Sequence, residues 1–268
     1  MVRCTPARTL SHARYAETFA TFVARSLEYP AMSRRLVEAA ASCPEAFAVL
    51  DIGAGPGKVL RDWMAHGDRR PGRYVAIEPN PVHAASLRET VASLKIDGRV
   101  FERNFDPQFR IPSTYDLVLF SHSLYWIADP VECVLHARRS LNEGGFVLVF
   151  LQSPIGIHPF FHLFNPLFER DRPSGPDQGF SSHELIQQLR AAGLAPQASF
   201  DPTPIDLTGL FDRGNEHERD ELISFCLQVE FADLAEPLKS DAVAYLRMAC
   251  VEQDGRLNWY EPTATIRV

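Results

Sequence analysis

The stretch VLDIGAGPGK, residues 49–58, decides the fold class. An apolar run typical of a buried strand leads directly into three glycines spaced G-x-G-x-G, and a helical pattern follows over residues 59–65. Glycines at a strand-to-helix turn allow a tight bend and a close approach of the main chain to a ligand, because they have no Cβ atom. The context therefore favours a ligand-binding loop over a purely structural turn.

The alternation of strand and helix continues on the carboxyl side of this loop. Such alternation predicts an α/β fold with a mostly parallel sheet and helices on both faces. The expected strands are residues 46–52, 73–77, 99–101, 116–120 and 146–151, and the expected helices are residues 59–65, 81–94 and 130–141, with a turn at 142–145.

The flanking segments are less regular. Residues 13–29 predict a helix that Pro30 ends, because proline disfavours helical geometry in the residue before it. Residues 153–180 contain five prolines and predict a long irregular connection with at most a short helix. Further helices are expected over residues 32–41, 182–192 and 216–250, and a last strand over residues 257–268.

Composition and charge narrow the class of protein. The chain has 268 residues, a formal net charge of −7 and a pI near 5.7, which argues against a general polyanion binder. No run approaches the roughly 18 apolar residues of a membrane span, and the N-terminal residues lack the apolar core of a secretory signal. Five cysteines without a CxxC pair indicate neither a disulfide framework nor a zinc site. We therefore expect a cytoplasmic protein with no nucleic-acid, membrane or metal partner.

Two phosphate-binding interpretations of the glycine loop fail on spacing. A dinucleotide fingerprint requires G-x-G-x-x-G, whereas the third glycine, Gly57, comes one residue early. A P-loop requires G-x-x-x-x-G-K-[ST]. Gly57 and Lys58 fit that pattern, but Ile52 stands at its first glycine and Val59 replaces its magnesium-binding hydroxyl. A nicotinamide-dependent dehydrogenase would then rest on fold analogy alone.

The loop instead resembles motif I of class I S-adenosylmethionine-dependent methyltransferases, [VIL]-[LV]-[DE]-x-G-x-G-x-G. The resemblance implies a Rossmann-like methyltransferase fold with a seven-stranded sheet. It also implies S-adenosyl-L-methionine as the cofactor and S-adenosyl-L-homocysteine as the product. Asp51 stands at the acidic position, which in the family lies close to the cofactor's amino-acid end. The implied cofactor contacts in the loop are Asp51, Gly53, Ala54, Gly55 and Gly57.

The second and third expected strands supply further cofactor candidates. Glu78 ends the second strand 25 residues beyond Gly53, and its carboxylate can accept both hydroxyls of a ribose. Asn104 or Asp106, after the third strand, is the candidate for the adenine edge. His83 is also a cofactor candidate, with a surface position as the alternative. The remaining cofactor candidates are Pro79, Phe120 and Ser121.

The segment DLVLFSHSLYW, residues 116–126, resembles the family's fourth strand, whose carboxyl end borders the transferable methyl group. Ligands of open α/β sheets bind beyond the carboxyl ends of the strands, so the polar and aromatic residues at this end are site candidates. The segment lacks the Asn/Asp-Pro-Pro-Tyr tetrad of nucleic-acid amino methylases, which argues against a base-flipping enzyme. The candidates are Ser121, His122, Tyr125 and Trp126.

A closer resemblance lies outside this common core. The stretch LSHARYAETFATFVARSLE, residues 10–28, resembles the N-terminal segment of histamine N-methyltransferases. The resemblance implies that Tyr15, Phe19 and Phe22 line the active site and that Glu28 forms a hydrogen bond to the substrate. Two other polar substrate contacts of that family differ here.

The family's substrate-binding glutamine falls on His122, and its C-terminal asparagine falls near Tyr260 or Glu261, of which Tyr260 is our substrate-binding candidate. Helical arithmetic places Glu28 about 220° around the helix axis from Tyr15. Glu28 can therefore join the site only if the helix breaks near residues 26–29, as Pro30 allows.

These interpretations predict transfer of a methyl group to a nitrogen of a small amine- or imidazole-containing molecule. His122 and Glu28 are the catalytic candidates. His122 would accept a proton or orient the substrate, and Glu28 would hold a remote cation or an N–H group. Tyr15, Phe19, Phe22, Tyr125 and Trp126 would supply apolar walls and cation–π attraction. Transfer to oxygen or carbon, and a non-catalytic cofactor-binding protein, remain the alternatives.

The same resemblance predicts the domain organisation. We expect an N-terminal helical substrate cap, a cofactor-binding core, a helical substrate-covering region and a terminal strand that returns to the core sheet. The expected partner is the small-molecule acceptor, bound by a monomer or a homodimer. The boundaries are residues 1–43, 44–203, 204–256 and 257–268.

Overall fold

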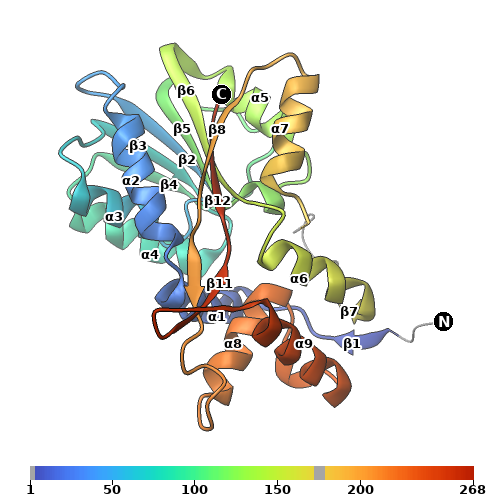
Figure 1. Ribbon diagram of the computed structural model, residues 1–268. Helices are drawn as coiled ribbons and strands as arrows, with labels where there is room; N and C mark the ends of the chain where they lie inside the picture. Colours follow the sequence, from blue (N-terminus) through green and yellow to red (C-terminus); the bar gives the residue numbers. More distant parts are fainter. Residues whose placement is uncertain (1–3, 172–178) are drawn as a thin grey trace.

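The computed structural model describes residues 4–171 and 179–268, so residues 172–178 of the expected irregular connection lie outside the described residues. Its centre is a seven-stranded sheet in the order β4-β3-β2-β5-β6-β12-β8 (Figure 1). Neighbouring strands from β4 to β6 are parallel, whereas β12 runs antiparallel to both β6 and β8. The predicted α/β fold with a mostly parallel sheet is therefore confirmed. The strands are β2 (Ala48–Ile52), β3 (Arg73–Ile77), β4 (Gly98–Phe101), β5 (Tyr115–Ser121), β6 (Leu141–Gln152), β8 (Gln197–Asp201) and β12 (Thr263–Arg267).

Helices cover both faces of this sheet. Successive residues of a strand point to opposite faces, and the fully buried β2 contributes Val49 to one hydrophobic cluster and Leu50 to the other. Burial on both sides explains why these strands read as uninterrupted apolar runs. One cluster contains side chains of α2 (Glu28–Ala40), α3 (Lys58–His66) and α4 (Pro81–Ser93), and the other contains side chains of α5 (Pro130–Arg138) and α7 (Ser182–Ala191).

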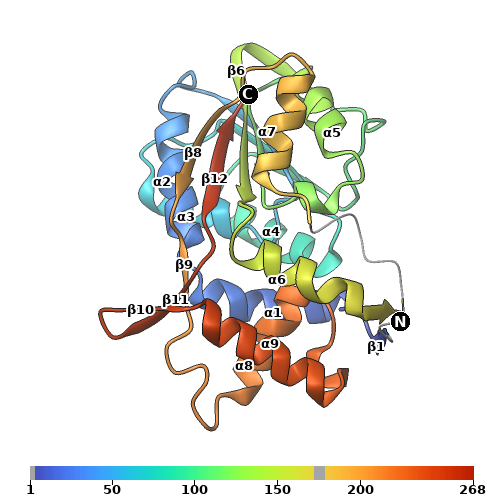
Figure 2. The same cartoon turned by 45° about the vertical axis from the view of Figure 1, so that its right-hand side comes forward.

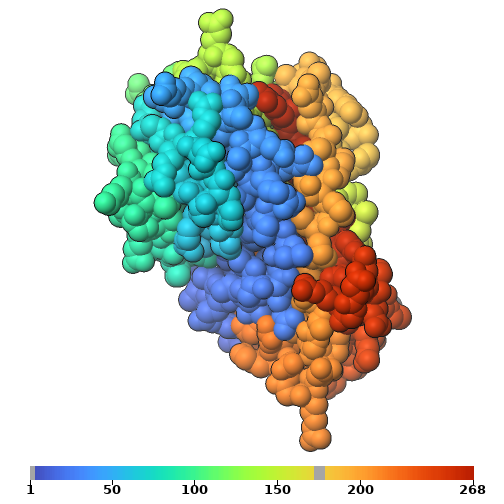
Figure 3. Space-filling model, turned by 60° about the vertical axis from the view of Figure 1, so that its left-hand side comes forward, coloured from blue at the N-terminus to red at the C-terminus, as the bar shows by residue number. Residues whose placement is uncertain are grey.

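A further helical layer, the cap, lies across one end of the sheet (Figures 1 and 2). In the space-filling view its N-terminal part, in dark blue, and its C-terminal parts, in orange and red, gather at the lower end of the molecule (Figure 3). Arg14 of the first cap helix forms ion pairs with Glu221 and Glu230, and Arg25 forms one with Glu218. The cap helices are α1 (His12–Arg25), α6 (Ile157–Phe164), α8 (Glu216–Leu227) and α9 (Glu236–Ala249).

Two small sheets complete the cap. Strands β1 and β7 form a parallel pair, and β10, β11 and β9 form an antiparallel sheet in that order. The strands are β1 (Thr5–Ala7), β7 (Phe168–Arg170), β9 (Pro204–Asp206), β10 (Val251–Gln253) and β11 (Arg256–Tyr260).

The helix expected over residues 13–29 is broken. It ends at Arg25, where Ser26 takes an extended conformation, and α2 begins at Glu28. The Ser26 hydroxyl accepts the N–H of Glu28 at 3.2 Å and so satisfies the first turn of α2. Pro30 lies within that first turn, where a missing N–H removes no helical hydrogen bond, and therefore does not end a helix.

Segments after residue 130 also differ from expectation. The described part of 153–180 is not irregular, because it forms α6 and β7 with a short 3₁₀ helix between them. The helix expected over 216–250 is two helices, α8 and α9. The last strand expected over 257–268 is likewise two strands, and only β12 belongs to the central sheet.

The helix expected to reach residue 141 ends at Arg138. The turn expected at 142–145 falls inside β6, as an irregularity in its pairing with β5. The domain boundaries remain a prediction. In the residues that the structure describes, no helix is both long and apolar enough to cross a membrane.

Candidate active site

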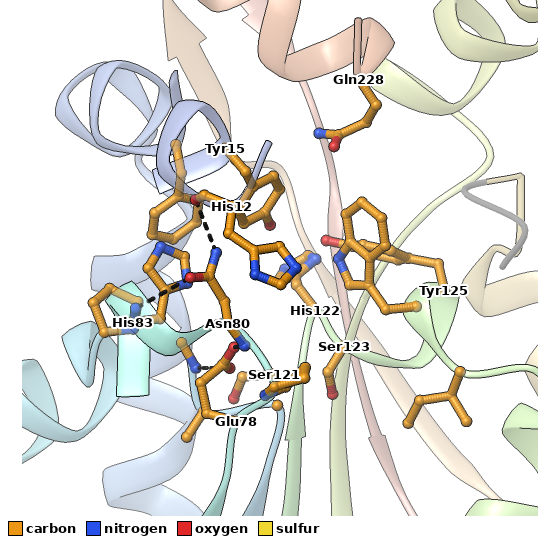
Figure 4. A pocket seen from close by; sticks show the side chains of 18 of the residues that line it. His12, Tyr15, Glu78, Asn80, His83, Ser121, His122, Ser123, Tyr125 and Gln228 are labelled. Atoms are coloured by element: carbon orange, nitrogen blue, oxygen red, sulfur yellow. Dashed lines mark hydrogen bonds between the residues drawn. The ribbon is translucent and has the colours of Figure 1, made fainter. Parts of the chain in front are cut away.

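A cavity of about 1160 Å³ lies between the cap and the sheet end that carries the glycine loop. Figure 4 shows Glu78, Ser121 and Ser123 on the sheet side of this cavity and Gln228 on the opposite side, with His122 between them. The volume exceeds the roughly 300–1,000 Å³ of typical ligand pockets, so the cavity has room for a nucleoside and a second small molecule.

The three glycines of the loop have different tasks. All have positive φ, at +73° for Gly53, +57° for Gly55 and +81° for Gly57. A Cβ on Gly53 would lie 2.3 Å from the Ser123 Cβ, and one on Gly57 would lie 2.9 Å from the Leu87 side chain. A Cβ on Gly55 would meet nothing within 4 Å. Gly53, Ala54 and Gly55 line the cavity, whereas Gly57 does not and makes room for α4 instead.

Glu78 ties the loop to the end of β3. Its Oε2 accepts the N–H of Gly55 at 2.8 Å, and its Oε1 accepts the N–H of Asn80 at 2.8 Å. Each carboxylate oxygen can accept a further hydrogen bond, so both remain available to a ribose diol. Burial raises the pKa of this carboxyl, while the two N–H donors lower it. The predicted cofactor residues Glu78 and Pro79 both line the cavity.

Two further predicted cofactor contacts do not line the cavity. Asp51 is buried beneath the loop, where its Oδ2 accepts the hydroxyl of Tyr74 at 2.7 Å and its Oδ1 has no partner. Burial raises the pKa of Asp51 to about 7. Phe120 is fully buried in the hydrophobic cluster that contains α5. Motif position located these residues in the fold but did not show whether their side chains reach the ligand.

The adenine-edge candidates, Asn104 and Asp106, both line the cavity, together with Phe105, which the sequence did not single out. His83 is buried and not at the surface. Its ring lies 5.6 Å from that of Tyr15, centroid to centroid, and burial lowers its pKa to about 4. Its position follows from the N-cap of α4, where Asn80 Oδ1 accepts the N–H of His83 at 3.4 Å (Figure 4).

The aromatic stripe of α1 lines the same cavity. Tyr15, Phe19 and Phe22 all border the cavity. Phe22 stacks on Phe225 of α8 with ring centroids 4.6 Å apart, and Tyr15 meets Trp126 edge-on at 5.5 Å. Ser121, Tyr125 and Trp126 line the same cavity.

The break between α1 and α2 places Glu28 in the site. Its side chain is nearly inaccessible, and its Oε2 lies 3.6 Å from the Nε2 of His122. The carboxyl of Glu28 lines the cavity. Burial raises the pKa of Glu28 to about 8.

His122 follows β5 in an unusual backbone conformation. Its φ is +51°, in the left-handed region that few residues other than glycine adopt. Its N–H donates to the carbonyl of Phe150 at 2.9 Å, and its buried Nε2 has no hydrogen-bond partner. Burial lowers the pKa of His122 to about 4, so the ring is neutral near pH 7. Such strain is often found at functional sites.

The structure places only one of the two C-terminal candidates at the cavity. Tyr260 does not line the cavity, and its hydroxyl donates to Gln253 at 3.0 Å. The neighbouring Glu261 lines the cavity instead and is 2% exposed. The sequence also missed lining residues that carry no motif. Those with polar or reactive side chains are Thr9, Ser11, His12, Tyr29, Lys58, Asn80, Ser123, Asp129, Gln152, Arg170, Cys226 and Gln228.

Across residues 4–171 and 179–268, no three His, Cys, Asp or Glu side chains gather as metal ligands would. The cavity wall carries the imidazoles of His12, His83 and His122, several buried carboxyls and aromatic side chains.

A family model described as a methyltransferase domain matches residues 50–147. Among solved structures, the chain is similar to the YcgJ protein of Bacillus subtilis, with a TM-score of 0.58, 14% identity and coverage of 88% of this chain and 96% of that chain. It is also similar to a putative methyltransferase of Bacillus halodurans, with a TM-score of 0.52, 15% identity and coverage of 87% and 96%.

A third similar structure is a chain of the complex between the Haloferax volcanii Trm112 methyltransferase activator and the putative methyltransferase. Its TM-score is 0.56 at 16% identity, with 96% of this chain and 94% of that chain covered. No curated protein matches the sequence. At these identities the structural matches show the fold. Residues 50–147, which contain the glycine loop, Glu78 and β5, are therefore a methyltransferase domain.

Proposed function

We propose that this enzyme transfers the methyl group to a neutral nitrogen of a small amine- or imidazole-containing acceptor. The observation that carries the proposal is the pair formed by His122 and Glu28, whose facing atoms are 3.6 Å apart. Both side chains line an aromatic-walled cavity at the carboxyl end of β5, and the buried Nε2 of His122 has no hydrogen-bond partner.

The donor half of the cavity fits S-adenosylmethionine. The open space above Gly55 accepts a ligand close to the main chain, and Glu78 keeps acceptor capacity on both carboxylate oxygens. Asn104 and Asp106 would contact the adenine. When bound, the cofactor supplies a methyl group on a positively charged sulfur, and the nearby carboxyls suit that charge.

The acceptor half of the cavity suits a nitrogen nucleophile. An amine attacks only when it is unprotonated, so an entering ammonium must first lose a proton. Glu28, with its pKa raised to about 8 by burial, can take that proton when it is ionised. His122, with its pKa lowered to about 4, does not hold a proton near neutral pH and instead accepts an N–H hydrogen bond that orients the nitrogen. We therefore assign Glu28 to the reacting nitrogen itself, whereas the sequence led us to expect that it binds a remote cation.

The rest of the pocket positions the acceptor. Tyr15, Phe22 and Trp126 exclude water and offer aromatic faces to a cation, an attraction of about 0.5–2 kcal/mol per good contact. Holding the nitrogen in line with the methyl group is the larger contribution, since positioning supplies up to about 7–11 kcal/mol in oriented reactions.

Turnover assays test the proposed acceptor atom. The protein is incubated with S-adenosylmethionine and a panel of primary amines and imidazoles, each paired with the alcohol or phenol of the same skeleton. Release of S-adenosylhomocysteine is measured, and mass spectrometry locates the new methyl group. We expect turnover with nitrogen acceptors. Methylation confined to oxygen or carbon, or cofactor binding without turnover on any nitrogen acceptor, would contradict the proposal.

A further inference from the structure

Glu261 is a buried carboxyl that the chemistry proposed above does not use. It lies between β11 and β12, lines the cavity and is 2% exposed. Its main chain is held firmly, because its N–H donates to the carbonyl of Thr203 at 2.9 Å and its own carbonyl accepts the Thr203 hydroxyl. The position of this carboxyl is therefore set by the fold.

Only one oxygen of the Glu261 carboxyl is used within the protein. Its Oε2 accepts the N–H of Ile157, the first residue of α6. Gly156 makes room for this contact, since a Cβ there would lie 2.0 Å from Oε2. The other oxygen, Oε1, is buried without a hydrogen-bond partner. Buried polar atoms normally have partners, so an unpaired carboxyl oxygen on a cavity wall points to a ligand that supplies one.

No cationic side chain of the described residues neutralises Glu261. Among the cations that line the cavity, Lys58 pairs with Asp62, and Arg170 donates to Asn165 and to the last carbonyls of α8. Burial raises the pKa of the Tyr125 hydroxyl, and the charges of Glu28 and Glu261 both raise it further, so the two carboxyls act on one region of the cavity. Burial raises the pKa of Glu261 well above its usual value of 4.5, so a positive charge supplied by a ligand would favour the ionised form of this carboxyl.

The order of strands places Glu261 away from the methyl donor. Along the sheet edge, Glu78 follows β3, the glycine loop follows β2, His122 follows β5 and Glu261 precedes β12. Neighbouring strands are about 4.8 Å apart, so β12 lies about 10 Å from β5, with β6 between them. Glu261 is thus positioned for the far end of an acceptor whose reacting atom lies at His122.

We propose that Glu261 binds a second, protonated nitrogen of the acceptor, and that the acceptor is a small diamine. One nitrogen lies neutral between His122 and Glu28, and the other donates its N–H bonds to Glu261 Oε1. This inference rests on the proposed function, because it takes the first nitrogen as the methylated atom. It adds the acceptor's second functional group and the residue that selects it.

Binding measurements test this pairing without turnover. Isothermal titration of the protein saturated with S-adenosylhomocysteine uses propane-1,3-diamine to hexane-1,6-diamine, the n-alkylamines of the same lengths, and the aminoalkanoates that carry a carboxylate at the far end. We expect the best diamine to bind at least tenfold more tightly than its monoamine, and the aminoalkanoate to bind more weakly than either. These comparisons use wild-type protein alone.

The variant Glu261→Gln isolates the charge. The amide keeps an oxygen that can accept the N–H of Ile157, so a merely structural role in capping α6 survives the change. We expect the diamine preference to fall to within twofold, with monoamine affinity unchanged. Glu89→Gln, an exposed glutamate on α4, is the matched control and should keep the full preference. An unchanged preference in Glu261→Gln, or no preference in the wild type, overturns the proposal.

The two proposals fail separately. Titrations repeated without S-adenosylhomocysteine test the diamine preference on the protein alone, because Glu261 is held by the chain itself. A preference that persists while no nitrogen acceptor is methylated contradicts the proposed function and leaves the diamine site standing. Methylation of monoamines without a preference for diamines contradicts the diamine site and leaves the proposed function standing.

Discussion

At the residue scale, burial sets the protonation states of His122 and Glu28, and an ion pair between the two side chains does not. Burial lowers the pKa of His122 to about 4 and raises that of Glu28 to about 8, so both shifts favour the uncharged form. The left-handed backbone of His122 costs about 1 kcal/mol that glycine would avoid. We attribute the presence of histidine at this strained turn to the role of its imidazole ring in the site.

The first prediction concerns Glu28. For an amine acceptor we expect kcat/KM to rise as the pH increases through about 8, because the ionised carboxylate takes up the acceptor's proton. Glu28→Gln should lower kcat/KM about 100-fold and remove this limb of the pH profile, while a limb set by the amine's own pKa remains. Affinity for S-adenosylhomocysteine should be unchanged. A pH profile identical to the wild type would exclude Glu28 as the proton acceptor.

The second prediction concerns Gly55. A valine side chain there would enter open space in the cavity, and we expect it to weaken S-adenosylhomocysteine binding more than tenfold. Gly144→Val is the matched control, because Gly144 also has a positive φ, at +77°, and open space around it but lies outside the cavity. Calorimetric titration of both variants checks this. Equal affinity in the two would contradict the loop assignment.

Individual site residues were predictable where a motif fixes both position and environment. Glu78 and Gly55 lie in the cavity as their spacing implied. Asp51 and Phe120 also stand at motif positions, yet Asp51 is bonded to Tyr74 and Phe120 is in the core. A motif gives the order of residues along a strand, whereas the side that faces the ligand depends on how neighbouring strands and helices close around it.

At the scale of elements, the break between α1 and α2 is the feature that brings Glu28 to the site. Local propensity indicated one helix, and Pro30 suggested only that a change was near. Ser26 bridges to Ile205, and the N–H of Leu27 donates to the carbonyl of Pro204 at 3.0 Å. The break is therefore fixed by a segment far away in the sequence, which no local pattern contains.

The third prediction concerns the attachment of α1 to α8. Arg14→Gln leaves Glu221 and Glu230 without their guanidinium partner, at side chains that are 14% and 13% exposed. We expect the free energy of unfolding to fall by about 1–3 kcal/mol, because partly buried carboxylates then lack a counter-charge. Arg139→Gln is the control, since its ion pair with Glu132 is largely exposed and such pairs contribute about 0–1 kcal/mol. Chemical denaturation measures both. Equal losses would show that the Arg14 ion pairs do not hold the cap.

At the scale of the whole molecule, the sheet was predictable and the cap was not. The alternating strand and helix patterns from residue 46 to 151 were sufficient to predict the fold of the core. This was possible because the strands are buried by helices close to them in sequence. The cap brings α1 together with α6 and α8. More than a hundred residues of sequence separate α1 from each of these two helices. Cavity residues such as Cys226 and Gln228 belong to it, and no spacing in the sequence links them to the glycine loop.

The fourth prediction concerns stability of the ligand-free protein. Burial raises the pKa of Glu28 from 4.5 to about 8 and that of Asp51 from 3.8 to about 7, so the folded state binds more protons than the unfolded state above pH 4.5. His83 and His122, with lowered pKa values, oppose this only below about pH 6.5. The free energy of unfolding should therefore fall by at least about 1–2 kcal/mol between pH 6.5 and 8, because the raised pKa of the buried Glu261 acts in the same direction.

Thermal unfolding at several pH values checks this, with an expected fall in Tm of about 3–6 °C for a chain of this size. Glu28→Gln should flatten the decline, because the amide does not titrate. A Tm that rises over this pH range would show that these carboxyls are already ionised in the folded protein.

The position of β12 between β6 and β8 has a consequence for the order in which the residues of the site are synthesised on the ribosome. The glycine loop, Glu78 and His122 have all been synthesised by residue 122, whereas Glu261 and the strand beside it follow more than a hundred residues later. A nascent chain would thus contain the residues that bind the methyl donor long before it contains the carboxyl that we assign to the acceptor. Selectivity for the acceptor would be acquired only after residue 261 has emerged.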